Sequence, residues 1–110
     1  MVRLTLTAGW QFDELLDHYI QLDRPEAVDR LVAALADALA LIEANPGSGR
    51  PCPLHYRAAA RWGYRWIKVH RYWFAYSDHR GHPVLTNVLF ETSDIPGRIA
   101  AEDDELIDPP

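Results

Sequence analysis

The sequence contains little sulfur and no long apolar run. Its 110 residues include one Cys and one Met, and no apolar run approaches the roughly 18 residues that a membrane-spanning helix needs. The lone Cys52 cannot form an internal disulfide, which excludes a disulfide-stapled secreted scaffold. The first residues also lack the charged and apolar regions of a signal peptide. We therefore expect one small soluble domain, cytoplasmic and without membrane contact.

Positive charge is scarce overall but concentrated in the middle of the chain. The net charge is -5, which by itself disfavours an anionic partner. Residues 49–90, however, carry seven basic side chains and one acidic one, whereas the segments before and after them are acidic. The asymmetry fits a middle segment that meets an anionic partner or an acidic protein surface. It fits equally a solvated sheet face whose arginines pair with acidic helices.

The first third of the chain predicts a short strand and two helices. Alternation over residues 2–6 indicates a strand, and Thr7 is placed to cap a helix of about 10–14 residues with one apolar stripe. Asp23 and Pro25 resemble the start of a longer helix, which Asn45-Pro46-Gly47 ends. Because the link between the helices is so short, they should form an antiparallel hairpin.

The rest of the chain predicts a connector and a sheet. Residues 45–54 are dense in Pro and Gly and indicate a loop, which lacks the Lys-Ser/Thr ending of a phosphate-binding loop. Residues 64–69, 72–77 and 84–91 have strand composition, with turns at residues 70–71 and 78–83. The order is β-α-α-β-β-β. It predicts an α+β fold in which a helical hairpin packs on a small, mostly antiparallel, twisted sheet. Residues 1–100 would form the single domain and residues 101–110 an acidic, mobile tail.

The order of these elements and several local motifs resemble the RelE/ParE superfamily of type II toxin–antitoxin toxins, in particular its ParE-like branch. The motifs are Pro25-Glu26-Ala27 opening the longer helix, Asn45-Pro46-Gly47 before a Gly/Arg/Pro connector, the strand pair 65–67 and 72–76, and a last apolar strand running towards Asp94 and Ile99. The resemblance extends from residue 2 to about residue 99. It implies a toxin of plasmid-stabilisation type that inhibits growth and is neutralised by a cognate antitoxin.

Two activities occur among such toxins. RelE-like members cleave mRNA in the ribosome without a metal, and ParE-like members inhibit DNA gyrase by binding. RelE-like toxins resemble one another in a Tyr-Arg-x-x-Tyr stretch, which here has Trp73 in the place of the arginine. They also keep a basic residue and then Tyr or His after the last strand, where this chain has Glu91-Thr92-Ser93-Asp94. These departures favour the ParE-like, non-enzymatic function.

The alternative, a ribosome-dependent mRNA endoribonuclease, has replacement residues available. Metal-free cleavage needs a base, an acid and cations that stabilise charge developing on the phosphate. His70 or His79 could carry the proton, and the available cations are Arg61, Arg65, Lys68 and Arg71. Each of these residues could equally be an ordinary strand or turn residue, so no catalytic residue is assigned.

Other site chemistries find little support. His79 and His82 have zinc-ligand spacing but occupy a tight turn with Asp78 alone beside them. Cys52 lies between two prolines and has no local base. No metal and no cofactor is predicted.

A binding function needs aromatic and Arg anchors, and the middle of the chain interleaves them. Strand alternation places Tyr64, Trp66 and Lys68 on one face, and one face must pack on the helices. The predicted partner-binding residues are Trp62, Tyr64, Arg65, Trp66, Lys68, Arg71 and Trp73. The expected partners are an antitoxin of ribbon–helix–helix type with an acidic C-terminal segment, and gyrase as target. Ribosome or mRNA is the alternative target, and a non-toxic member that keeps only antitoxin binding is a third possibility.

Overall fold

A computed structural model describes residues 2–51, 64–78, 81–91 and 104–110. Its elements in chain order are β1 (Arg3–Thr5), α1 (Leu6–Gln21), α2 (Pro25–Ala44), β2 (Arg50–Pro51), β3 (Arg65–Val69), β4 (Tyr72–Ser77), β5 (Val84–Phe90) and β6 (Leu106–Ile107). Two helices followed by the β3–β4–β5 meander confirm the predicted α+β fold and its β-α-α-β-β-β order.

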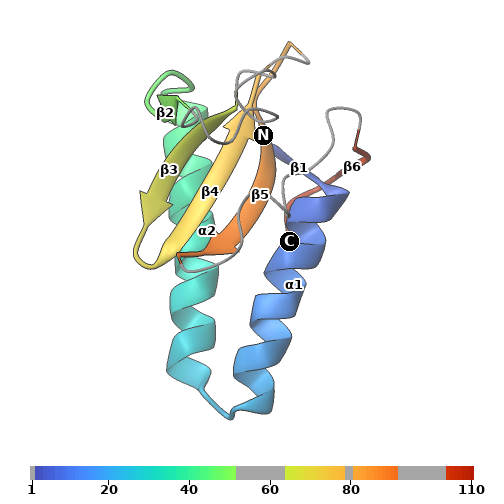
Figure 1. The fold of residues 1–110 in the computed structure, drawn as a ribbon, viewed down its shortest axis with the longest axis vertical. Coiled ribbons are helices and arrows are strands. Elements are labelled where there is room, and N and C mark those ends of the chain that lie inside the picture. Colours follow the sequence, from blue (N-terminus) through green and yellow to red (C-terminus); the bar gives the residue numbers. More distant parts are fainter. Residues whose placement is uncertain (1, 52–63, 79–80, 92–103) are drawn as a thin grey trace.

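In the described residues the strands form one sheet of order β2-β3-β4-β5-β1-β6. All neighbouring pairs are antiparallel except β1 and β5, which run parallel. Figure 1 shows the helical hairpin behind this sheet, reaching well past the end that carries the β3–β4 turn. The overhang of α1 and α2 beyond that turn positions the cleft described below.

The C-terminal segment contributes a strand, which corrects the prediction of a mobile tail for the residues described there. Leu106 and Ile107 pair with β1, and the Leu6 amide donates to the Glu105 carbonyl at 2.6 Å. The Asp104 carboxylate accepts from the Thr7 amide at 2.9 Å, and Arg3 forms an ion pair with Asp108. The acidic residues of the tail thus satisfy a helix N-terminus and an arginine, which composition alone did not reveal.

Helix α1 begins two residues earlier than predicted. Its N-cap is Thr5, whose hydroxyl accepts from the Ala8 amide at 3.1 Å. The same hydroxyl donates to the Thr86 carbonyl at 2.7 Å. The predicted cap Thr7 therefore lies inside the helix, because Thr5 can cap α1 and bond to the neighbouring strand at once.

The link between the helices differs from its predicted role as a helix start. Asp23 has φ 54 and follows the last residues of α1, while Arg24 is the N-cap of α2 without a side-chain cap bond. The Arg24 amide donates to the Tyr19 carbonyl and the Asp23 amide to the Ile20 carbonyl. This pair of bonds is a Schellman motif, with Asp23 at the left-handed position that usually holds glycine. Asp23 therefore closes the first helix and does not cap the second.

The core lies between the helices and one face of the sheet. Alternation along β4 directs Tyr72, Phe74 and Tyr76 into it, where they meet the buried side of α2, including Leu31 and Leu35. The pairing of β4 with β5 shifts at Ala75/Tyr76, so Thr86 is passed over in the register as a β-bulge. This packing holds β3, β4 and their turn in a fixed position against the helical hairpin of α1 and α2.

Candidate functional site

The β3–β4 hairpin carries most of the residues predicted to act or bind. Antiparallel register places Arg65 opposite Tyr76, Trp66 opposite Ala75 and Lys68 opposite Trp73. His70 and Arg71 form the two-residue turn, in which His70 has φ 56. The candidates Arg61, Trp62, His79 and Cys52 lie outside the described residues.

Burial narrows the predicted partner-binding set. Tyr64 is 1% exposed and Trp66 4% exposed, so both side chains belong to the interior and cannot meet a partner directly. Lys68 and Arg71 have side chains 42% and 69% exposed, and Trp73 is half-buried. The surface formed by Lys68, Arg71 and Trp73, here called the hairpin surface, is the part of the set that is accessible.

Arg65 has a structural contact. Its Nη1 donates to the Gly49 carbonyl at 3.1 Å. The Tyr76 hydroxyl, in the strand opposite, donates to the Pro46 carbonyl at 2.7 Å and accepts from the Gly49 amide at 2.8 Å. A Cβ at Gly49 would lie 2.6 Å from the Tyr76 hydroxyl oxygen, so glycine is required for this close approach. Arg65 and Tyr76 together hold the connector that follows α2 onto the sheet.

Glu91 binds both of the exposed cations on the hairpin. Its Oε1 accepts from Arg71 at 2.9 Å, and its Oε2 lies 3.1 Å from the Lys68 ammonium. The hydrogen bonds from Arg71 and then Lys68 hold the pKa of the Glu91 carboxyl below its usual value. Glu91, which is part of the segment that departs from the RelE-like pattern, is therefore the counter-ion of Lys68 and Arg71.

Aromatic contacts complete the hairpin surface. The Trp66 and Trp73 rings meet edge to face with centroids 6.3 Å apart. The Lys68 ammonium lies 5.6 Å from the centroid of the Trp73 ring, and the Arg71 guanidinium 5.0 Å from that of Phe90. Cation–π contacts of this kind keep both cations close to aromatic surface. The hairpin surface thus presents the half-buried Trp73 ring beside the charge network of Lys68, Arg71 and Glu91.

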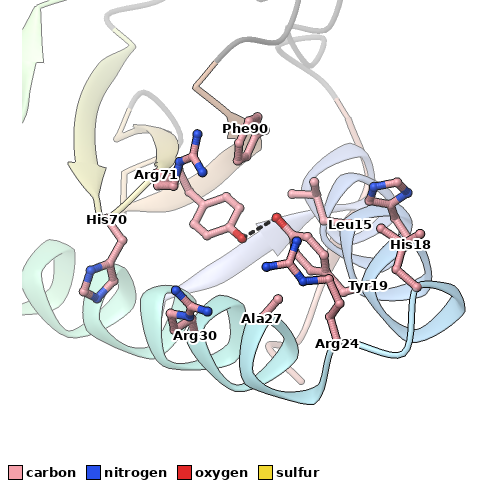
Figure 2. A pocket seen from close by; sticks show the side chains of 11 residues that line it. Leu15, His18, Tyr19, Arg24, Ala27, Arg30, His70, Arg71 and Phe90 are labelled. Atoms are coloured by element: carbon pink, nitrogen blue, oxygen red, sulfur yellow. Dashed lines mark hydrogen bonds between the residues drawn. The ribbon is translucent and has the colours of Figure 1, made fainter.

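A second feature was not foreseen from the sequence. A cleft of about 520 Å³ opens between the overhanging helical hairpin and the β3–β4 turn. Figure 2 shows Arg71 on the sheet side of the cleft and Arg30 and Arg24 on the helical side, with Tyr19 beside Arg24. Its lining residues are Leu15, His18, Tyr19, Leu22, Arg24, Ala27, Arg30, His70, Arg71, Tyr72 and Phe90. They come from four segments that the fold alone brings together, so no local motif marks this cleft.

The two tyrosines join the helical hairpin to the sheet. The Tyr19 and Tyr72 hydroxyl oxygens are 2.7 Å apart, and either group can be the donor. Burial, followed by this hydrogen bond, raises the pKa of Tyr72 well above its usual value, although Arg30 and Arg71 act in the opposite direction. Tyr72 therefore keeps its proton at physiological pH and remains able to donate a hydrogen bond.

The described ranges hold no cluster of three or more His, Cys, Asp or Glu side chains that could bind a metal. No helix in the same ranges is both long and apolar enough to cross a membrane. The chemistry that these residues offer is the recognition of anions and of apolar or aromatic surface.

Fold and site define a small α+β domain in which a helical hairpin is packed on a sheet and aromatic and basic side chains are exposed at one end. The chain belongs to the ParE toxins: the family model described as the ParE toxin of the type II toxin–antitoxin system parDE matches residues 2–88. This match confirms the resemblance seen in the sequence. No curated protein matches the chain. Membership of this family makes the protein the toxin of a type II pair and implies a cognate antitoxin as its partner.

Proposed function

We propose that this toxin inhibits DNA gyrase by binding it and is held inactive by its antitoxin. The observation that carries the proposal is the double ion pair of Glu91 with Lys68 and Arg71. An RNA-cleaving site would need these two cations free, whereas here both are bound to a protein carboxylate.

Metal-free RNA cleavage requires preorganised positive charge aimed at the reacting phosphate. A carboxylate between Lys68 and Arg71 cancels one of their two positive charges and repels the phosphate, and the group keeps a net charge of about +1. Arg65 is bound to the Gly49 carbonyl, and Trp73 offers no charge where RelE-like toxins keep arginine. The arrangement therefore favours a protein that acts by binding over an endoribonuclease.

The hairpin surface suits a protein partner. Half-buried Trp73 supplies aromatic area of the kind found at binding hot spots, and Lys68 and Arg71 form a charged rim around it. A rim of this charge attracts an acidic segment and raises its association rate. We propose that this surface contacts the target and that the antitoxin, of ribbon–helix–helix type, covers it with an acidic C-terminal segment.

The test is a supercoiling assay with purified gyrase and the full toxin, accompanied by sequencing of transcript ends after induced expression. We expect supercoiling to be inhibited and mRNA to stay intact. Trp73→Ala should weaken inhibition at least about tenfold, since hot-spot truncations cost roughly 2 kcal/mol or more. Arg50→Gln, at an exposed position on β2, is the matched surface control and should leave inhibition unchanged. Uninhibited gyrase together with cleaved transcripts would replace the proposal by the endoribonuclease function.

A further inference from the structure

Among the described residues, the cleft between the helical hairpin and the β3–β4 turn is lined by cations and by no carboxylate. Arg24, Arg30 and Arg71 carry positive charge there, and His18 and His70 can do so. The chain as a whole has a net charge of -5. A concave site of one charge sign on a protein of the opposite net sign concentrates oppositely charged small ligands.

Two of the three arginines have charge to offer. Arg71 is bound by Glu91. Arg30 donates only its Nε, to the Glu26 carbonyl at 3.2 Å, which leaves both terminal nitrogens. Arg24 makes neither an ion pair nor a side-chain hydrogen bond with any residue of the described ranges. Arg24 and Arg30 therefore form no ion pair within the described ranges, and each is a planar group that binds oxyanions bidentately.

The tyrosine pair supplies a neutral donor in the cleft that these arginines line. Two hydroxyl groups contain two hydrogens, and their mutual bond uses one. The second hydrogen is free to bond to a ligand oxygen. Tyr72 is 5% exposed and anchored in the core, so the donor is held at a fixed place.

Apolar side chains line both walls of the cleft beside its cations. Phe90 meets Tyr72 edge to face with centroids 5.8 Å apart, and Leu15 and Leu22 line the helical side. The volume of about 520 Å³ lies in the range typical of small-molecule sites, roughly 300–1,000 Å³. A ligand with both an anionic and an apolar part would be matched on both sides.

We propose that this cleft binds a small phosphomonoester, its phosphate on Arg24, Arg30 and the tyrosine pair and its organic part against Phe90. The charge balance selects phosphate over carboxylate. A phosphomonoester carries about two negative charges and three acceptor oxygens at neutral pH, whereas a carboxylate has one charge and two oxygens. The site is separate from the hairpin surface except for Arg71, and the inference does not depend on gyrase being the target.

Phenyl phosphate is the probe for the test, titrated into the full chain at low salt by calorimetry and by amide chemical shifts. We expect saturable binding with shifts at residues of the cleft. Arg24→Gln and Arg30→Gln should each weaken it about tenfold, because a hydrogen bond to a charged group contributes roughly 1.5–3 kcal/mol. Arg50→Gln, which removes an arginine outside the cleft, should bind as the wild type does.

Further ligands establish the chemistry. Inorganic phosphate should bind more weakly with the same dependence on the two arginines, while benzoate and phenol should bind at least tenfold more weakly than phenyl phosphate. Both arginines are exposed, so melting curves of the two variants should match the wild type. The proposal is overturned by absent binding, by binding that ignores both arginine substitutions, or by an acidic peptide binding more tightly than phenyl phosphate.

Discussion

The Tyr19 hydroxyl oxygen lies 2.7 Å from that of Tyr72, although 53 positions separate the two residues in the sequence. The bond ties the end of α1 to the start of β4, where the helical hairpin overhangs the sheet (Figures 1 and 2). Removing either hydroxyl leaves the other without this partner. The pair therefore fixes the spacing between the two walls of the cleft.

We expect Tyr19→Phe and Tyr72→Phe each to lower the free energy of unfolding by about 1 kcal/mol, with coupling of about 0.5–1.5 kcal/mol in a double-mutant cycle. Urea unfolding of the four proteins measures this. Additive effects, with no coupling, would show that the bond does not contribute to stability.

The raised pKa of Tyr72 also predicts a response to alkali. Because burial and Tyr19 raise the folded-state pKa above the usual value of 10.0, the stabilisation is fully present below that pH and is lost as pH rises above it. Absorbance titration of tyrosinate should show a late step above the usual pKa, and this step should be absent in Tyr72→Phe. A Tyr72→Phe curve that retains the late step would contradict the assignment.

The protonation of Glu91 should set the lowest pH at which the ion pairs of the hairpin surface remain formed. Since Arg71 and Lys68 lower its pKa below 4.5, the ion pairs are formed above that pH and are lost as pH falls through the lowered folded-state pKa. Carbon NMR of the carboxyl group measures the pKa directly. Arg71→Gln and Lys68→Gln should each move it back towards its usual value, the first by more. Asp37, exposed on α2, offers a control carboxyl that neither substitution should affect.

Local patterns predicted the elements whose signals are local. The stripe of α1, the Pro25 start of α2, its stop before Pro46 and the three long strands all follow from spacing and composition. Residues whose roles depend on a distant partner were misjudged. Thr7 was predicted to cap α1, whereas the cap is Thr5, the last residue of β1, whose bond to Thr86 spans 81 positions. Residues 106–107 were placed in a mobile tail because β1 is far away in the sequence.

The same distinction applies to the candidate site. The basic and aromatic middle segment was recognised, but its division into buried Trp66, structural Arg65 and exposed Lys68 depends on tertiary packing. The cleft could not be predicted, since its walls come from residues 15–30, 70–72 and 90.

Thr86 provides a test of the β-bulge. Its hydroxyl is buried and has no hydrogen-bond partner in the part of the chain that the structure describes, while its carbonyl accepts from Thr5. Thr86→Val removes an unsatisfied group and keeps the shape, so we expect it to raise the free energy of unfolding by up to about 1 kcal/mol. Thr5→Ala loses the helix cap and the bond to Thr86 and should cost about 1–2 kcal/mol, with Thr5→Ser recovering most of the loss. Thermal unfolding compares the three; destabilisation by Thr86→Val would mean that its hydroxyl is satisfied in solution.

Asp23 is the last test, because its backbone conformation and its charge can be separated. With φ 54 it occupies the left-handed region, where glycine has no steric penalty. Its charge follows the C-terminus of α1, which is unfavourable, and precedes the N-terminus of α2, which is favourable, so the two helix-dipole effects oppose each other. Asp23→Gly should therefore stabilise the protein by about 0.5–1 kcal/mol. Asp37→Gly, the same change inside α2, should destabilise it by about 0.3 kcal/mol, because glycine is that much less favourable than aspartate inside a helix. Equal signs for the two substitutions in urea unfolding would show that Asp23 is not left-handed in solution, and the Schellman closure of the hairpin would have to be abandoned.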